Sequence, residues 1–165
     1  HTRLDDKGNI ILLKYQDRSK WSRPLIKRGF DYLDEATEPF EVSSYHFEAA
    51  IASLHAAAPS FEQTDWKTIY NLYDLLYKEQ PGPVVALNKA IASAYAISRQ
   101  NALEELQAIN GLENYYLYYI SMGECYFDLN EKVKAKKYFE DALRMTPSLP
   151  ERQLLQDKIV NCVES

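Results

Sequence analysis

One stretch, residues 116–147, constrains this chain more than any other, because small and aromatic residues recur in it at fixed offsets. Gly123 lies on one predicted helix, and Ala135 and Ala142 lie on the next. These small residues remove side-chain bulk where two antiparallel helices cross. The aromatic residues expected to fill the space around the crossing are Tyr119, Tyr126 and Phe139. Pro147 should stop the second helix, since proline lacks an amide hydrogen and clashes with the preceding turn.

The spacing is similar to that of the tetratricopeptide repeat (TPR), a helix–turn–helix unit of about 34 residues. A weaker copy precedes it: Ala90, Ala102, Leu106 and Ile109 recur 33 residues later as Gly123, Ala135, Phe139 and Ala142. One such unit cannot bury its apolar face alone, so neighbouring units should stack on it. We therefore expect an all-α fold, with about eight helices in antiparallel pairs that form a TPR-like right-handed stack.

Local signals divide the chain into an extended arm or linker, residues 1–16, and a TPR-like helical domain, residues 17–165. Three polar residues are the expected helix caps: Ser43, Thr64, and Asn101 in a capping box with Glu104. The abrupt start suggests a fragment of a longer protein. The ranges predicted as helical are 19–36, 44–58, 65–79, 83–98, a short helix between 101 and 111, two helices within 116–147, and 150–163.

Composition narrows the function classes. Hydrophobic residues make up 46% of the 165 residues and charged residues 26%, as in globular proteins, and no apolar run is long enough to span a bilayer. The net charge of −5 argues against a nucleic-acid-binding domain. Cys125 and Cys162 have no disulfide-framework spacing, so we expect buried, reduced thiols and a cytoplasmic location.

No pattern indicates catalysis, a metal or a cofactor. His46 and His55 lie nine residues apart on one predicted helix, too far for a shared ligand face, and no cysteine has a metal-like spacing with them. The chain has only five glycines and no P-loop or dinucleotide-binding motif, which argues against a phosphate-binding loop. We therefore expect a protein that is not an enzyme, with His55 as a helix-packing histidine that is hydrogen-bonded to a neighbour.

Two surface features leave alternatives open. The first predicted helix carries basic residues at its start, including Arg23 and Lys27, and acidic residues at its end, the reverse of what the helix dipole favours. This pattern is either a solvated face or a basic end that docks on something acidic. The chain also has thirteen tyrosines, and those at 115–119 pass around most of one helix. They belong either to the core or to a partner-binding concave face.

Five ordered motifs carry a further resemblance. They are Asp17-Arg18-Ser19-Lys20-Trp21, Ala49-Ala50-Ile51-Ala52 with His55-Ala56, Thr64-Asp65-Trp66, Tyr73-Asp74 and Pro83-Val84-Val85-Ala86-Leu87-Asn88-Lys89-Ala90. From about Gly8 to Glu151 the chain resembles the C-terminal, TPR-like extension of a bacterial family of extracytoplasmic-function (ECF) RNA polymerase sigma factors. Lys20 and Lys89 stand where that family usually has arginine.

The resemblance implies a non-catalytic regulatory or interaction element. In that family two sigma domains precede the extension; one melts the −10 promoter region and binds core polymerase, and the other reads the −35 region. The implied partners are therefore those sigma domains, core RNA polymerase, or both. Promoter DNA would be bound only through the sigma domains, no membrane is involved, and a homodimer stays open.

Candidate interface or motif residues come from these motifs, from the basic start of the first predicted helix and from the tyrosines of the sixth. They are Asp17, Arg18, Trp21, Arg23, Lys27, His55, Asp65, Trp66, Asn88, Tyr116 and Tyr119. Tyr116 and Tyr119, with Met122, replace polar histidine and arginine positions of the family. The motif residues either hold helices together by buried polar contacts or form a shared surface. The alternative function is a small-ligand sensor that uses the aromatic surface around residues 115–126, or a stand-alone TPR scaffold.

Overall fold

The computed structural model describes residues 16–24, 26–28, 31, 44–146 and 148–163. These residues contain seven bounded α-helices, one 3₁₀ helix and no strand, which confirms the all-α prediction. The elements are η2 (Arg18–Lys20), α2 (Ser44–Ala57), α3 (Trp66–Glu79), α4 (Pro83–Ala96), α5 (Arg99–Gln107), α6 (Tyr116–Asp128), α7 (Lys132–Met145) and α8 (Leu149–Asn161).

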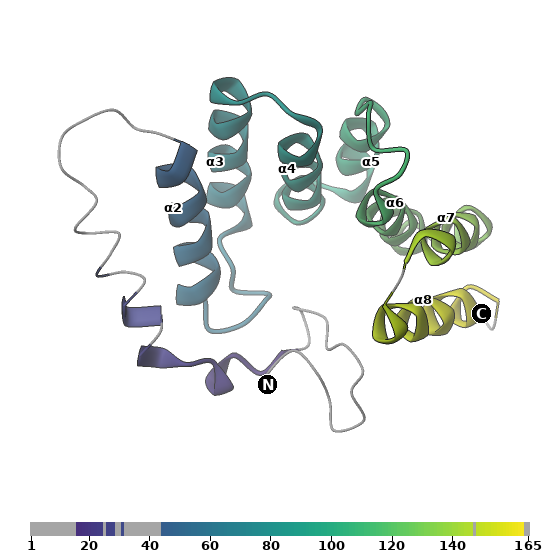
Figure 1. The fold of residues 1–165 in the computed structure, drawn as a ribbon, viewed down its shortest axis with the longest axis horizontal. Helices are drawn as coiled ribbons and strands as arrows, with labels where there is room; N and C mark the ends of the chain where they lie inside the picture. Colours follow the sequence, from purple (N-terminus) through teal and green to yellow (C-terminus); the bar gives the residue numbers. More distant parts are fainter. Residues whose placement is uncertain (1–15, 25, 29–30, 32–43, 147, 164–165) are drawn as a thin grey trace.

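The helices pack in chain order. Each helix from α2 to α8 contacts its neighbours in sequence, and α4 also contacts α6. Figure 1 shows these helices following one another around an arc, from α2 at one end to α8 at the other. Contact between alternate helices is expected when the pairs α4–α5 and α6–α7 stack as repeats.

The predicted crossing of α6 and α7 is present. Gly123 is buried, and a Cβ atom added to it would lie 2.5 Å from Cε1 of Phe139. Ala135 and Ala142 are fully buried, and Phe139 is 1% exposed. The small residues thus bring the two helices close enough for the Phe139 ring to lie directly against the Gly123 backbone.

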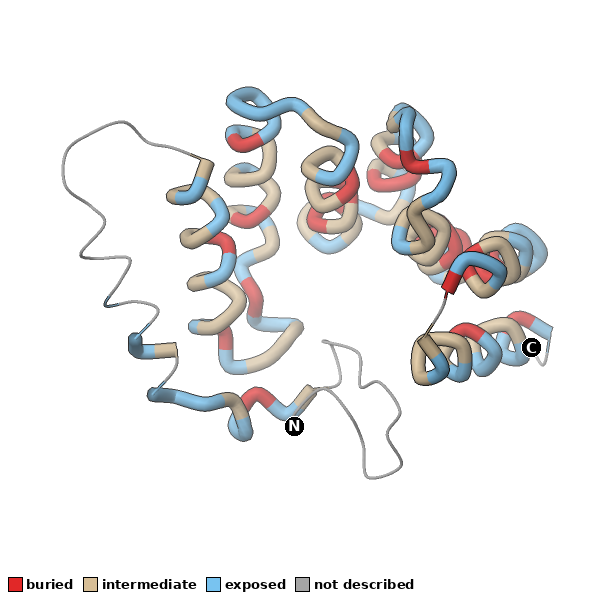
Figure 2. The backbone as a smooth tube through the Cα atoms, in the orientation of Figure 1, coloured by how far each residue is buried: buried red, intermediate tan, exposed pale blue. Residues whose placement is uncertain are grey.

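Apolar side chains form two core clusters in the described part of the chain. The larger one runs from α4 to α8 and includes Leu87, Leu106, Met122, Phe139 and Leu155. The smaller one joins α2, α3 and α4 through Ile51, Ile69 and Ala92. Figure 2 shows buried residues on the sides where neighbouring helices face each other. Each cluster therefore stabilises the stack by linking successive helices.

Two predicted helix caps are wrong. Asp65 rather than Thr64 caps α3, and its carboxylate accepts a hydrogen bond from the Thr68 amide at 3.0 Å. Ser98 rather than Asn101 caps α5, and its hydroxyl accepts from the Asn101 amide at 3.1 Å. In both cases a neighbouring residue also had a suitable side chain.

The first predicted helix also differs at its start. The structure has the short η2 turn at Arg18–Lys20, followed by helical residues from Arg23, with Pro24 in the first turn, where proline is tolerated. Asp17 caps the start of η2, because its carboxylate accepts a hydrogen bond from the Ser19 amide at 3.0 Å. The extended arm, the Ser43 cap and the Pro147 stop lie outside the described residues.

Both cysteines are free and buried, as expected. Burial raises the pKa of the Cys125 thiol to about 11. The described helices include none that combines the length and apolarity needed to cross a bilayer.

Candidate functional site

Arg18 fixes the N-terminal turn to the connection between α2 and α3. Its side chain is buried, and its Nη1 atom donates hydrogen bonds to the carbonyl oxygens of His55 at 2.8 Å and Ala58 at 3.0 Å. Its Nη2 atom donates to the Thr64 hydroxyl at 3.0 Å. The carbonyl end of a helix carries partial negative charge, and a planar guanidinium can reach several acceptors at once. The Arg18 contacts therefore stabilise the C-terminal end of α2.

Two neighbours complete this anchor. Asp17 caps η2 and so fixes the backbone from which the Arg18 side chain projects. The Trp21 ring lies 5.1 Å from the Arg18 guanidinium, within the range of a cation–π contact. The first motif of the resemblance thus acts as one unit that binds the second motif, at His55, and the third, at Thr64.

His55 and Trp66 pack edge to face, with ring centroids 5.2 Å apart. Trp66 also stacks on Tyr95 at 4.6 Å, and its indole nitrogen donates to the Phe61 carbonyl at 3.2 Å. The packing role of His55 is confirmed. Its Nδ1 atom has no hydrogen-bond partner among the described residues, so a hydrogen bond from this ring could involve only Nε2. Burial and, secondarily, the Arg18 charge lower the pKa of His55, which favours the neutral ring.

The fourth and fifth motifs are joined by an ion pair. The Lys89 ammonium on α4 lies 2.6 Å from Oδ1 of Asp74 on α3. Lys78 contacts Oδ2 of the same carboxylate at 2.7 Å. Asn88, the preceding residue on α4, is half-buried. Polar contacts therefore join one residue from each of the five motifs across successive elements: Arg18 to His55 and Thr64, and Lys89 to Asp74.

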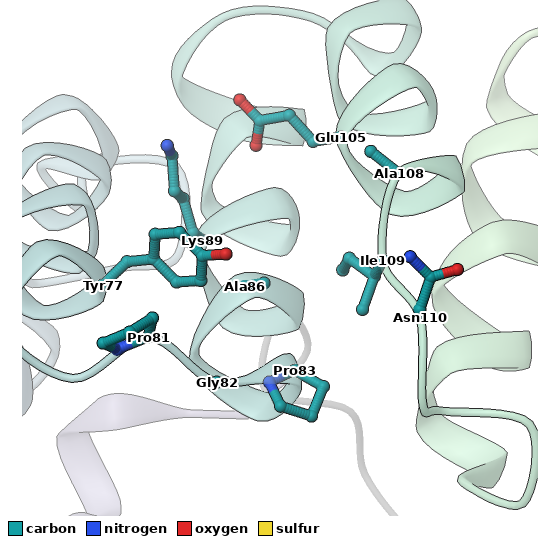
Figure 3. Close-up of a pocket in the computed structure, with 10 residues that line it drawn as sticks. All are labelled: Tyr77, Pro81, Gly82, Pro83, Ala86, Lys89, Glu105, Ala108, Ile109 and Asn110. Carbon is teal, nitrogen blue, oxygen red and sulfur yellow. The ribbon is translucent and has the colours of Figure 1, made fainter.

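A cleft of about 500 Å³ opens between α3 and α5, with α4 as its floor; we call it the α3–α5 cleft (Figure 3). Its residues come from the end of α3, the Pro-Gly-Pro connection, the first half of α4 and the end of α5. They are Tyr77, Pro81, Gly82, Pro83, Ala86, Lys89, Glu105, Ala108, Ile109 and Asn110. Figure 3 shows Lys89 and Glu105 at one end of the cleft and the two prolines at the other.

Glu105 is held firmly at its end of the α3–α5 cleft. Its Oε1 atom accepts hydrogen bonds from the Tyr70 hydroxyl at 2.9 Å and from the Asn101 side chain at 3.1 Å. Its Oε2 atom is buried and has no hydrogen-bond partner among the described residues. Burial, the hydrogen bond to Glu105 and the Glu105 and Asp74 charges raise the pKa of Tyr70 to about 12.

The tyrosines of α6 make most of their contacts within the protein, with other aromatic rings and with hydrogen-bond acceptors. Tyr126 stacks on Tyr138 at 5.4 Å, and Tyr119 meets the same ring at 6.3 Å. The Tyr119 hydroxyl donates to the Glu113 carbonyl at 3.0 Å, and the Tyr116 hydroxyl donates to Glu151 at 2.9 Å. The expected aromatic surface is thus largely used in packing between helices.

The remaining candidates lie apart from these contacts. Arg23 and Lys27 are exposed on the segment that follows η2, in contrast to the buried Arg18. Within the described ranges, no group of three or more histidine, cysteine or acidic residues is placed to hold a metal ion.

No local sequence motif marks the α3–α5 cleft. The signal that could have found it is the 33-residue internal repeat. Ala86 and Glu105 correspond in that repeat to Tyr119 and Tyr138, so two large aromatic positions of the second unit are small or charged in the first. A difference of this kind predicts less filled space around α4 than around α6.

Comparison with known proteins gives two matches. Residues 1–37 match DUF6596, a family of unknown function. The chain is also 35% identical, over 150 residues, to an uncharacterised protein of Rhizobium meliloti. That alignment covers 90% of this chain and 36% of the relative, so the chain spans about a third of the length of the curated relative it matches. No solved structure gives a significant match.

Proposed function

We propose that the chain is a non-catalytic interaction domain of an ECF-type sigma factor, which supports or controls the sigma domains during transcription initiation. It would do so by contacting those domains or core RNA polymerase, or by receiving a signal. The resemblance names this class of protein, and a stack of helical repeats offers the extended surface that such a role requires.

The observation that carries the proposal is that hydrogen bonds and an ion pair connect residues from all five motifs. Arg18 of the first motif binds the backbone at His55 of the second and the side chain of Thr64 of the third. Lys89 of the fifth pairs with Asp74 of the fourth. Residues that lie in different motifs of the resemblance, far apart in sequence, therefore contact one another directly in this structure. This supports the view that the chain has the fold of that family's extension, and that its motifs serve the fold first.

The length of the relative fits a domain that accompanies other sequence. In the Rhizobium protein the matching region is about a third of the chain. We expect sigma domains in the sequence that precedes this domain in the natural gene. Reading that sequence is the simplest first check.

Deletion within the full-length factor tests the proposal. Run-off transcription from the cognate promoter should be measured with purified core polymerase and either the complete factor or a factor that ends before residue 16. The account predicts a clear change in transcript yield, and the same change in cells. Equal yields from both factors, in the purified system and in cells, would refute the proposed role.

A further inference from the structure

We propose that two copies of this chain form an antiparallel, two-fold dimer through the outer face of α8. This inference goes beyond the proposed function and does not depend on it. It rests on the side chains that α8 turns outward, on their spacing and on the symmetry of their order.

The charged side chains of α8 are mostly used in contacts with the rest of the stack. Glu151 accepts a hydrogen bond from a tyrosine of α6 at 2.9 Å, and Arg152 donates to two carbonyl oxygens at the end of α7. Lys158 forms an ion pair with a glutamate of α6. Glu151 and Lys158 lie on the same side of α8 as the buried Leu155. The charges that would normally keep the last helix of a stack soluble are therefore directed inward.

The opposite side of α8 is exposed, and its residues are uncharged. Three of them are apolar: Leu149 is 80% exposed, Val160 48% and Val163 66%. Gln153 and Gln156 lie between them and are also exposed; we call these five residues the α8 stripe. Figure 2 shows the buried residues of α8 on the side that faces α7 and exposed residues on the far side. The outer face of a terminal repeat is normally polar, so this exposed apolar surface indicates a contact.

The α8 stripe has the spacing and the order of a self-complementary helix contact. Its positions are separated alternately by four and three residues, as in helices that pack along one another. When two copies run antiparallel with their Gln156 residues opposite each other, Leu149 of one copy meets Val163 of the other. Gln153 then meets Val160. Every position of the stripe has a partner in this arrangement, and both ends of the contact are apolar.

A second copy also fits the charge of this face. Each chain has a net charge of −5, so two copies repel each other unless they meet through an uncharged surface such as the α8 stripe. A glutamine side chain both donates and accepts, so the two Gln156 side chains can pair across the two-fold axis. A polar pair within an otherwise apolar helix contact also fixes its register.

The size of the contact sets its strength. The 13 residues of α8 make a helix roughly 20 Å long. One helix packed on another covers less than the ~800 Å² per partner of a standard stable interface. We therefore expect a reversible dimer with a dissociation constant in the micromolar range.

Sedimentation of the 165-residue chain at concentrations from about 5 to about 500 µM tests the inference. The mass should rise reversibly toward that of two chains, and added salt should not dissociate the dimer, because the stripe is uncharged. Val160→Lys places a charge from each copy in the contact and should raise the dissociation constant at least about tenfold. Val133→Lys is the matched control on α7, at a residue that is 87% exposed and lies outside the stripe, and it should change nothing. Circular dichroism should show both variants folded.

Cysteine crosslinking tests the antiparallel register. Gln156→Cys should form a disulfide between copies under mild oxidation, because the two-fold axis brings this position against itself. Leu149→Cys should not crosslink to itself but should crosslink when mixed with Val163→Cys. The natural Cys125 and Cys162 are buried, so the unchanged chain gives the background rate.

Three results would overturn the inference. The first is a chain that stays monomeric over the whole concentration range. The second is an equal effect of the Val160 and Val133 variants, which would place the contact elsewhere. The third is self-crosslinking of Leu149→Cys as fast as that of Gln156→Cys, which would exclude the antiparallel arrangement.

Discussion

At Gly123 the contact between α6 and α7 leaves no room for a methyl group, because an added Cβ atom would lie 2.5 Å from the Phe139 ring. Glycine normally costs a helix about 1 kcal/mol relative to alanine. Overpacking in a core costs typically ~1–3 kcal/mol, and Phe139 is buried and cannot easily move away. Close packing therefore decides the residue at this position.

We predict that Gly123→Ala lowers the free energy of unfolding by up to about 2 kcal/mol, because the steric cost exceeds the gain in helix propensity. Urea denaturation followed by circular dichroism measures this change. Gly82→Ala is a control without a clash, since nothing lies within 4 Å of its added Cβ atom. Gly82 caps the start of α4, where alanine is less favourable than glycine, so this variant should lose up to about 1 kcal/mol through the cap alone. An unchanged or higher stability of the Gly123 variant would contradict the packing described here.

His55 should make stability depend on pH. Burial, together with the Arg18 charge, lowers the pKa of His55 below its usual 6.5, so the unfolded chain binds a proton more readily than the folded one. The contribution is fully present above about pH 6.5 and is lost as the pH falls below that value. Chemical denaturation at pH 7.5 and 5.5 should therefore show a smaller loss for His55→Gln than for the natural sequence. The two proteins share every other titrating group, so an equal loss in both would exclude a contribution from His55.

At the scale of elements, periodicity predicted the helices well because each buries one face against a neighbour. The predicted range 44–58 became α2, and 65–79 became α3 with one residue less at its start. The caps were harder to predict, because a hydroxyl at a helix start can have a competing partner. Thr64 bonds to Arg18, which lies 46 residues earlier, and no local pattern reveals such a contact.

The exchange of roles between Thr64 and Asp65 can be tested directly. Asp65→Ala removes the cap of α3 and should destabilise that helix by about 1 kcal/mol. Thr64→Ala removes an acceptor of the Arg18 side chain, so it should loosen the η2 turn instead. Hydrogen exchange of amides in 18–21 and 66–69 distinguishes the two effects. If Thr64→Ala exposes 66–69 more than Asp65→Ala does, Thr64 is the cap after all.

For the whole molecule, the stack of helices could be predicted from the repeat, whereas the α3–α5 cleft could not be located from local signals. Its floor and walls come from three helices, and its space depends on which side chains fill a groove between repeats. The motifs that carry the resemblance predicted a set of candidate residues. Their arrangement into an anchor at Arg18 and an ion pair at Asp74 depends on tertiary contacts.

The reactivity of the buried Cys125 thiol tests whether the helices stay packed around it. Cys125 belongs to the larger core cluster, and burial raises its pKa to about 11, so little thiolate exists at neutral pH. We predict that Cys125 reacts with iodoacetamide many times more slowly in the folded chain than in urea at pH 7.5. Mass spectrometry of tryptic peptides measures both rates. A folded-state rate close to that in urea would mean that the packing around α6 opens readily.

The most direct test of the central claim is whether this domain binds the transcription machinery on its own. The 165-residue chain should be titrated with core RNA polymerase, and separately with the sigma domains, at two salt concentrations, and its binding measured. We predict saturable binding to at least one of them. A variant with glutamate at Lys20, Arg23 and Lys27 should stay folded but bind more weakly, most clearly at low salt, because exposed charges mainly steer association. No binding to either partner, under conditions in which the complete factor initiates transcription, would contradict the account.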